Sequence, residues 1–346
     1  MENLTYQNII IRMPNWLGDI VMATPFIAAV KKSFPLAKLT VMCQHIGAQL
    51  LLHDPHIDEL FAFKRSKPFF SRRHDLESIT EHLKIGHYDL GFLLSNSLSS
   101  AWWFFQGGVK RRIGFKNGLR NIFLTDKMTK PSKQEPIHQV DEYLLLLKAL
   151  GITPQKISPK LFLTDQEKNE ALGLFKRLNI DDSQLVIGVC PGAAYGSAKC
   201  WPKEYFCELL SKYADQKSRL RFLFLGDRTQ EVMIEEIVAK FPELSINLAG
   251  KTTIRELMSV ISRLDLLLTN DSGPMHIAQA LGVKLLALFG STSPQRTGPY
   301  DSGKILYHHV DCSPCYKRTC PIEFPCMRSI TPQIVYHEIA KLLNHP

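Results

Sequence analysis

Two polar runs place groups able to bind phosphate directly after apolar segments. The first is NDSGPMHIA at residues 270–278, which contains Asp271, Ser272, Gly273 and His276 and follows a leucine-rich run. A strand that turns straight into a helix leaves backbone N–H groups unpaired at the helix start, where the helix dipole favours negative charge. The run therefore predicts a phosphate-binding turn. An ordinary helix cap formed by Asp271 or Ser272 explains the same residues.

The second run carries a lysine in a turn of small residues, PGAAYGSAKCWP at residues 191–202. Small residues let the backbone approach a ligand closely, and Lys199 can reach a diphosphate as a mobile cation. The spacing is not that of a Walker loop, and no Gly-x-Gly-x-x-Gly follows the first predicted strand, which argues against a nicotinamide site. A surface loop is the alternative. Asp227, after the next predicted strand, can accept a ribose or adenine contact.

Asp19 is a candidate for proton transfer, in the run NWLGDIVMATP at residues 15–25. A β-branched run precedes it and an apolar-periodic stretch follows, so we expect Asp19 in the first turn of a helix at the carboxyl end of a strand. Open α/β sheets bind ligands at that edge, where a carboxylate can act as a general base. A helix cap is the simpler alternative.

Basic residues gather in two places in the N-terminal half of a chain whose net charge is +9. One group, in a stretch expected to be a loop, contains Lys64, Arg65, Lys67, Arg72 and Arg73; the other contains Lys110, Arg111, Arg112, Lys116 and Arg120. Such clusters indicate an anionic partner, which is nucleic acid, a phosphorylated glycolipid or a membrane surface. A solvated basic face is the alternative.

Four of the eight cysteines lie close together near the C-terminus, namely Cys312, Cys315, Cys320 and Cys326. Four thiolates can close a tetrahedral structural zinc site. The spacing differs from that of a zinc ribbon, and a reduced, metal-free loop explains the same residues. A disulfide scaffold is not expected in a chain of this length and compartment.

An alternation of strand and helix patterns along the chain must position these residues. In the first half we predict strands at 9–12, 39–43, 59–63 and 88–94 and helices at 19–34, 75–84 and 139–150. After a break at residues 151–154, we predict strands at 185–190, 221–225, 266–269 and 285–289, and a capping box at Thr164 and Glu167 that opens a helix. Strands separated by helices predict parallel sheets that are covered on both faces.

This pattern predicts an α/β protein of two Rossmann-like domains, residues 1–160 and 161–346, facing a central cleft. An amphipathic tail helix at 331–343 is expected to pack back on the N-terminal domain across the junction. Hydrophobic residues make up 45% of the chain and charged residues 22%, which is typical of a globular protein. Neither a secretory leader nor an apolar run near the ~20 residues of a membrane span is present, which predicts a cytoplasmic protein.

Four motifs together resemble a known family. Residues 15–25, 191–202, 270–276 and the FGSTSP run at 289–294, followed by TGP at 297–299, resemble the ADP-heptose:lipopolysaccharide heptosyltransferases, glycosyltransferase family nine. The resemblance covers nearly the whole chain. The NWLGD run at residues 15–19 and the C-terminal cysteine block are most similar to those of the heptosyltransferase II type.

This resemblance implies a GT-B fold and inverting transfer of L-glycero-D-manno-heptose from ADP-heptose to the first heptose of the Kdo-lipid A inner core. By the resemblance, Asp19 deprotonates the acceptor hydroxyl. Donor-site residues would be Lys199, Asp271, Ser272, Gly273, His276 and Asp227, and the acceptor would meet Lys64, Arg65, Arg111, Arg112 and Arg120. No cofactor is implied for catalysis, and the enzyme would work at the cytoplasmic face of the inner membrane, as a peripheral protein.

Other functions remain open at this point. Heptosyltransferases I and III would use another core position. A basic nucleic-acid-binding protein would explain the charge and the cysteines, yet neither exposed aromatic platforms nor a groove-reading helix is evident, so we expect no nucleic-acid partner. A non-catalytic nucleotide-binding protein would explain the second domain only.

Overall fold

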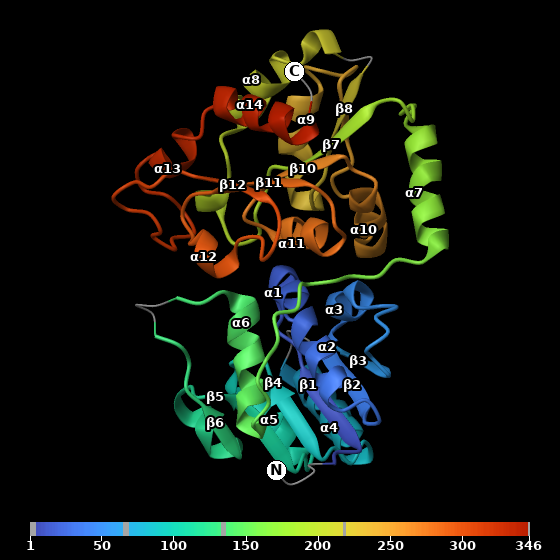
Figure 1. The fold of residues 1–346 in the computed structure, drawn as a ribbon, viewed down its shortest axis with the longest axis vertical. Coiled ribbons are helices and arrows are strands. Elements are labelled where there is room, and N and C mark those ends of the chain that lie inside the picture. Colours follow the sequence, from blue (N-terminus) through green and yellow to red (C-terminus); the bar gives the residue numbers. More distant parts are fainter. Residues whose placement is uncertain (1–4, 65–68, 133–135, 217–218, 345–346) are drawn as a thin grey trace. The chain divides into compact units, whose positions relative to one another are not determined.

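The computed structural model describes residues 5–64, 69–132, 136–216 and 219–344. The chain divides into two compact units, Met1–Phe162 and Leu163–Pro346, with the division two residues after the predicted one. Each unit contains a parallel sheet with helices on its faces (Figure 1). Arg65 and Lys67, in the first basic group, lie outside the described residues.

The described residues of the first unit form a six-stranded parallel sheet in the order β3-β2-β1-β4-β5-β6. Its strands are β1 (Asn8–Arg12), β2 (Lys38–Gln44), β3 (Glu59–Phe63), β4 (Leu90–Leu93), β5 (Arg111–Phe115) and β6 (Asp126–Met128). Its helices are α1 (Leu17–Met22), α2 (Thr24–Ser33), α3 (His45–Leu50), α4 (Phe69–Ile85), α5 (Leu98–Gln106) and α6 (Gln139–Leu144), with 3₁₀ helices η1 (Gly118–Phe123) and η2 (Leu145–Leu150). Ile9, Ile10 and Ile11 are fully buried, as expected for a strand covered on both faces.

The helix predicted at 19–34 is two helices, and the break has a local cause. Pro25 lies in the first turn of α2, where its missing N–H is tolerated but would interrupt a continuous helix. The Thr24 hydroxyl donates to the Val21 carbonyl at 2.8 Å, which occupies one of the acceptors at the end of α1. The expected loop around residues 64–73 is also shorter than predicted, because α4 begins at Phe69.

The described residues of the second unit form another six-stranded parallel sheet, in the order β12-β11-β10-β7-β8-β9. Its strands are β7 (Leu185–Cys190), β8 (Leu220–Phe224), β9 (Ser245–Asn247), β10 (Leu266–Asn270), β11 (Leu285–Phe289) and β12 (Lys304–Tyr307). Its helices are α7 (Asp165–Arg177), α8 (Lys203–Ser211), α9 (Glu231–Val238), α10 (Ile254–Ser262), α11 (Gly273–Ala280), α12 (Pro294–Thr297), α13 (Pro325–Arg328) and α14 (Pro332–Leu343), with 3₁₀ helices η3 (Ser197–Lys199), η4 (Ala214–Gln216) and η5 (Arg228–Gln230). The capping box predicted at Thr164 and Glu167 begins α7.

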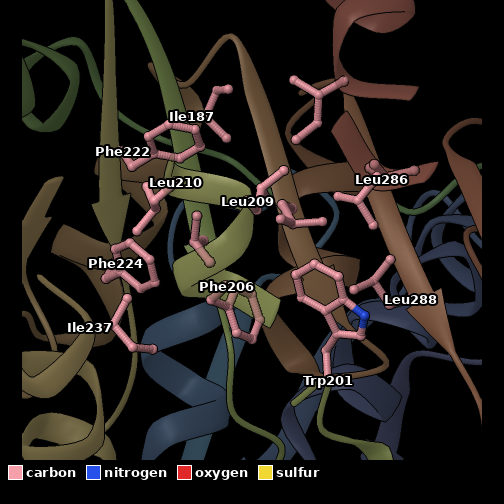
Figure 2. Close-up of a cluster of buried hydrophobic side chains, with 14 of the residues drawn as sticks. Ile187, Trp201, Phe206, Leu209, Leu210, Phe222, Phe224, Ile237, Leu286 and Leu288 are labelled. Carbon is pink, nitrogen blue, oxygen red and sulfur yellow. The ribbon is translucent and has the colours of Figure 1, made fainter. Parts of the chain in front are cut away.

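The core of the second unit lies between its sheet and the helices α8, α9 and α14. Figure 2 shows Phe222 and Phe224 of β8 facing Phe206, Leu209 and Leu210 of α8, with Trp201 beside Leu288 of β11. The Trp201 indole donates to the Ile330 carbonyl at 2.7 Å, which satisfies its polar atom inside the core.

The tail helix α14 packs into the core of the second unit. Its apolar residues Val335 and Ile339 are fully buried in the core of its own unit, where α14 packs on α8 and β10. Its amphipathic face is therefore used within the second unit, and packing of α14 on the first unit stays a prediction. Within the described ranges, no helix is long and apolar enough to cross a membrane.

Candidate functional site

The strand order of the second unit brings two of the predicted loops together. β7 pairs with β8 on one side and with β10 on the other. Successive strands are therefore added outward on one side of β7 and then, from β10 on, outward on its other side. Ligands of open α/β sheets bind at such a switch point, at the carboxyl ends of the strands. Asn270, fully buried at the end of β10, donates to the Pro191 carbonyl at 2.6 Å and accepts from the Trp201 N–H at 3.2 Å. It therefore ties the β10 turn to both ends of the Lys199 loop.

Lys199 and Asp271 meet directly at this edge. The Lys199 ammonium lies 2.5 Å from Asp271 Oδ2, with the two side chains 13% and 6% exposed. The same oxygen accepts the Thr292 hydroxyl at 2.6 Å, from the polar turn that follows β11. Burial of a carboxylate is tolerated when the group is paired with a cation and hydrogen-bonded, and Asp271 satisfies both conditions. The three loops after β7, β10 and β11 are joined through this one atom.

The Lys199 loop is also held from the C-terminal side of the unit. Lys199 Nζ lies 4.9 Å from the centroid of the Tyr195 ring, and the Arg318 guanidinium carbon lies 5.3 Å from it. The Tyr195 hydroxyl donates to the Tyr316 carbonyl at 2.8 Å. Gly196 has a φ of 152°, and a Cβ there would collide with the Arg318 carbonyl oxygen. This glycine is required by both backbone conformation and close approach.

The α11 start takes the form that the sequence predicted. Ser272 is the extended residue before the helix, Gly273 is its first residue, and neither Asp271 nor Ser272 forms a side-chain cap. The Ser272 hydroxyl lies 3.1 Å from that of Thr269, and Ser272 is half-buried. His276 lies in the first turn, 3% exposed. Because its side chain is not used as a cap, Asp271 is available for the contact with Lys199.

Asp227 lies at the end of β8, where it caps η5. Its carboxylate accepts the Thr229 N–H at 2.8 Å and the Thr229 hydroxyl at 2.5 Å, and the residue is exposed. Gln230, one turn later, covers Gly192 and Gly226, because a Cβ on either glycine would collide with the Gln230 side chain. The two glycines thus leave room for this side chain between the ends of β7 and β8.

In the first unit, Asp19 lies at the carboxyl end of β1 as predicted. It is the third residue of α1, half-buried, and the extended residue before that helix is Trp16. Asp19 is therefore not the N-cap residue. Close by, the buried Arg12 guanidinium donates to Asn15 Oδ1 at 2.7 Å and lies 4.7 Å from the Phe63 ring centroid.

Arg111 and Arg112 are engaged within the first unit. Arg111 donates to both Asp126 carboxylate oxygens at 3.1 and 2.7 Å and to the Tyr6 hydroxyl at 2.9 Å. These partners raise the pKa of Arg111 above its ordinary value, the hydrogen bond to Asp126 most of all. Arg112 donates to the Phe123 and Val109 carbonyls at 2.6 and 2.5 Å. Both side chains therefore connect β5 to neighbouring segments of the first unit.

Arg120 differs from these two because its cation is buried with few partners. The residue is 1% exposed, and its Nη1 donates to Asn96 Oδ1 at 3.0 Å. Its Nε and Nη2 form no hydrogen bond to the described residues. Burial lowers the pKa of Arg120 to about 10, so the guanidinium is still charged at neutral pH. Lys64 is exposed just beyond β3.

The four clustered cysteines differ in exposure and in their contacts. No group of three or more His, Cys, Asp or Glu in the described ranges can hold a metal ion. Cys312 is exposed, Cys315 and Cys320 are half-buried, Cys326 is buried, and all four are free thiols. Cys320 Sγ instead accepts the Phe324 N–H at 3.2 Å, and a Cβ on Gly290 would collide with the Cys326 sulfur. Zinc binding by these thiols stays a prediction.

Sequence reasoning did not assign a role to Asn270, Thr292, Tyr195 or Arg318. Thr292 and Asn270 lie inside the motifs quoted above, directly after predicted strands, and this position was the available signal. Arg318 follows no strand, and its approach to Tyr195 depends on how the C-terminal loop folds. No pattern in the sequence indicates that approach.

Comparisons with known proteins identify the family of the chain. Residues 76–324 match the model of glycosyltransferase family 9 (heptosyltransferase). The chain is 29% identical to lipooligosaccharide heptosyltransferase 2 of Campylobacter jejuni over 96% of this chain and 98% of that protein. It is 31% identical to lipooligosaccharide heptosyltransferase 2 of Haemophilus influenzae over 84% of this chain and 86% of that one.

A solved structure extends the likeness to the fold. The Escherichia coli ADP-heptose lps heptosyltransferase II matches with a TM-score of 0.80 and 26% identity over 98% of this chain and 99% of that chain. The predicted GT-B fold class is thereby confirmed. The chain is a glycosyltransferase and belongs to glycosyltransferase family 9, the heptosyltransferase family.

Proposed function

We propose that this enzyme is a heptosyltransferase II, which transfers L-glycero-D-manno-heptose from ADP-heptose to the first heptose of the Kdo-lipid A inner core. The observation that carries the donor assignment is the buried Lys199–Asp271–Thr292 cluster at the switch point of the second sheet. The relatives named heptosyltransferase 2 support the choice of acceptor.

The donor diphosphate binds between Lys199 and the start of α11. An ammonium has three donor N–H bonds, so Lys199 can keep Asp271 as one partner and donate to a phosphate with another. When the bond between the anomeric carbon and ADP breaks, negative charge grows on the leaving diphosphate. A lysine and helix N–H groups directed at that charge stabilise the transition state more than the ground state. Ser272, Gly273 and His276 line this position, and Asp227 contacts the nucleoside.

The acceptor hydroxyl attacks the anomeric carbon, and its proton passes to Asp19 as the new carbon–oxygen bond forms. The configuration inverts in this single displacement. Among the basic residues, Lys64 is exposed, and Nε and Nη2 of Arg120 form no hydrogen bond to the described residues. We assign these two residues to acidic groups of the acceptor. Arg111 and Arg112 support this region from within, and Arg65 is a further acceptor candidate on sequence grounds alone. The enzyme works at the cytoplasmic face of the inner membrane, where its lipid-anchored acceptor is found.

The proposal is tested by measuring ADP release with ADP-heptose and defined core acceptors. We expect turnover on the core that carries one heptose and none on the heptose-free core. Turnover on the heptose-free core would reassign the enzyme to heptosyltransferase I, and turnover only on a more extended core would favour heptosyltransferase III. ADP binding without turnover on any core would contradict catalysis and favour a nucleotide-binding role.

A further inference from the structure

One face of the first unit gathers large apolar side chains at its surface. α5 and η1 pack together, and five of their side chains are between 40% and 72% exposed: Leu98, Trp102, Phe105, Leu119 and Ile122. The half-buried Phe123 joins the two elements, with its ring centroid 5.3 Å from that of Trp102 and 5.5 Å from that of Phe105. We call these six residues the α5–η1 surface. An exposed apolar cluster of this kind marks an interaction site.

The segment that builds this surface carries positive charge only. Between Asp89 and Asp126 the chain has five Lys or Arg residues and no Asp or Glu. Lys116 and Lys110 are exposed, and the Arg112 guanidinium carbon lies 5.6 Å from the Phe105 ring centroid. The flanking acids are already paired, Asp89 with Lys110 at 2.9 Å and Asp126 with Arg111 at 2.7 Å. Of the five cations, Lys110 and Arg111 are paired and Arg120 is buried, so the positive charge beside the apolar cluster comes from Arg112 and Lys116.

This combination selects among the possible occupants. A second copy of the chain on the same face would bring like charges together, which disfavours association. An anionic bilayer fits both the apolar side chains and the positive charge. Tryptophan and phenylalanine bind at the level of the lipid head groups, and lysine is attracted to lipid phosphates. We propose that the α5–η1 surface docks on an anionic phospholipid bilayer, with Trp102, Phe105, Leu119 and Ile122 entering the interface. This deepens the proposed function, on which it rests for a membrane-anchored acceptor.

Vesicle binding tests the proposal without any turnover. In a Trp16→Phe background, Trp102 is the only exposed tryptophan, because Trp103 and Trp201 are buried. We expect its emission to shift to the blue and the protein to sediment with vesicles of phosphatidylcholine and phosphatidylglycerol. Binding should weaken with added salt and be much weaker on pure phosphatidylcholine.

A matched pair of variants isolates the surface. Leu119→Glu with Ile122→Glu places carboxylates in the proposed interface and should weaken vesicle binding by about tenfold or more. Leu36→Glu is the control, because Leu36 is 99% exposed on another part of the same unit and should bind as wild type. Both proteins should retain turnover on a soluble, lipid-free acceptor saccharide.

Three results would overturn the proposal. They are no vesicle binding by the wild type, equal binding by the Leu119/Ile122 variant, and a concentration-dependent dimer that this variant abolishes. A wild type that binds vesicles but has no heptosyltransferase activity contradicts the proposed function instead. Activity on the soluble acceptor without vesicle binding contradicts only the docking surface, so the two failures are distinguishable.

Discussion

Lys199 and Asp271 are 72 residues apart in the chain, and their charged groups lie 2.5 Å apart in a site where both side chains are largely buried. Such a pair is costly to break, because removal of one partner leaves an uncompensated charge out of water. In the proposed donor site, the lysine is thus held in place before the donor arrives, and the diphosphate would accept its remaining N–H bonds.

Lys199→Ala is expected to lower kcat/KM for ADP-heptose by roughly ten- to a hundredfold, since a charge-assisted phosphate contact contributes about 1.5–3 kcal/mol. The KM for the acceptor should change little. Lys203→Ala is the matched control, because Lys203 pairs with Glu236 on the surface of the same unit. Steady-state ADP release with each substrate varied in turn makes the comparison, and unchanged donor kinetics would remove Lys199 from the site.

Arg120→Met separates acceptor binding from folding. No ion pair of Arg120 is found within the described part of the chain, so replacing this buried charge with an apolar side chain of similar length is expected to leave the free energy of unfolding unchanged or to raise it. If Arg120 binds an acidic group of the acceptor, the KM for the acceptor should rise about tenfold or more while the KM for the donor stays unchanged. Urea unfolding and ADP-release kinetics measure the two effects. A destabilised protein with normal acceptor kinetics would make Arg120 a structural residue only.

The ion pair between Glu167 and Arg255 makes the stability of the second unit depend on pH. Arg255 Nε and Nη2 donate to the two Glu167 oxygens at 2.7 Å each, and these bonds lower the pKa of Glu167 to about 2. Because the folded pKa lies below the unfolded one, the stabilisation is complete above the unfolded pKa of about 4.3 and is lost as the pH falls toward 2.

Glu167→Gln should therefore lose less stability than wild type when the pH falls from neutral through this range, as followed by urea midpoints. Glu170→Gln is the matched control on the same helix, since the Glu170 carboxylate accepts from Gln166 at 2.9 Å and not from a cation. Parallel pH profiles for all three proteins would show that the pair is unimportant for stability.

Metal removal should leave catalysis intact. The candidate chemistry uses Asp19, Lys199 and the start of α11, and none of these roles requires a metal ion. We expect EDTA treatment to leave kcat for ADP release within a few-fold of the untreated enzyme. Metal analysis of the reduced protein decides separately whether the four C-terminal thiols hold about one zinc per chain. Activity restored only by an added divalent ion would contradict the metal-free mechanism.

The sequence predicted the buried strands well, because their apolar runs leave few alternatives. β3, β7 and β11 begin and end at the predicted residues. β5 was missed since it starts with Arg111 and Arg112, whose polar groups look like those of a surface loop. Their partners, Asp126 and the Phe123 carbonyl, lie on segments that meet β5 only in the folded sheet.

The contacts within the candidate site could not be predicted either, because they depend on the order of the strands. Each loop residue could be placed after its own strand, but the contact between Lys199 and Asp271 depends on β10 pairing with β7 while β8 and β9 lie on the other side. Periodicity identifies strands and leaves their order open. The Asp271–Thr292 hydrogen bond depends likewise on the pairing of β10 with β11.

Asp19→Asn gives the sharpest test of the reaction. A general base contributes typically two to four orders of magnitude, so kcat should fall by about 10²- to 10⁴-fold while the affinity for ADP, measured by calorimetry, stays the same. Asp19 lies in the first turn of α1, where the helix dipole stabilises a carboxylate. Exclusion of water around the bound substrates must therefore raise its basicity, or the carboxylate acts chiefly by orienting the hydroxyl. Trp16→Phe, at the residue before the same helix, is the control for local disturbance. An Asp19→Asn enzyme that turns over within a few-fold of wild type would leave Asp19 a structural residue, and the base would have to be sought elsewhere.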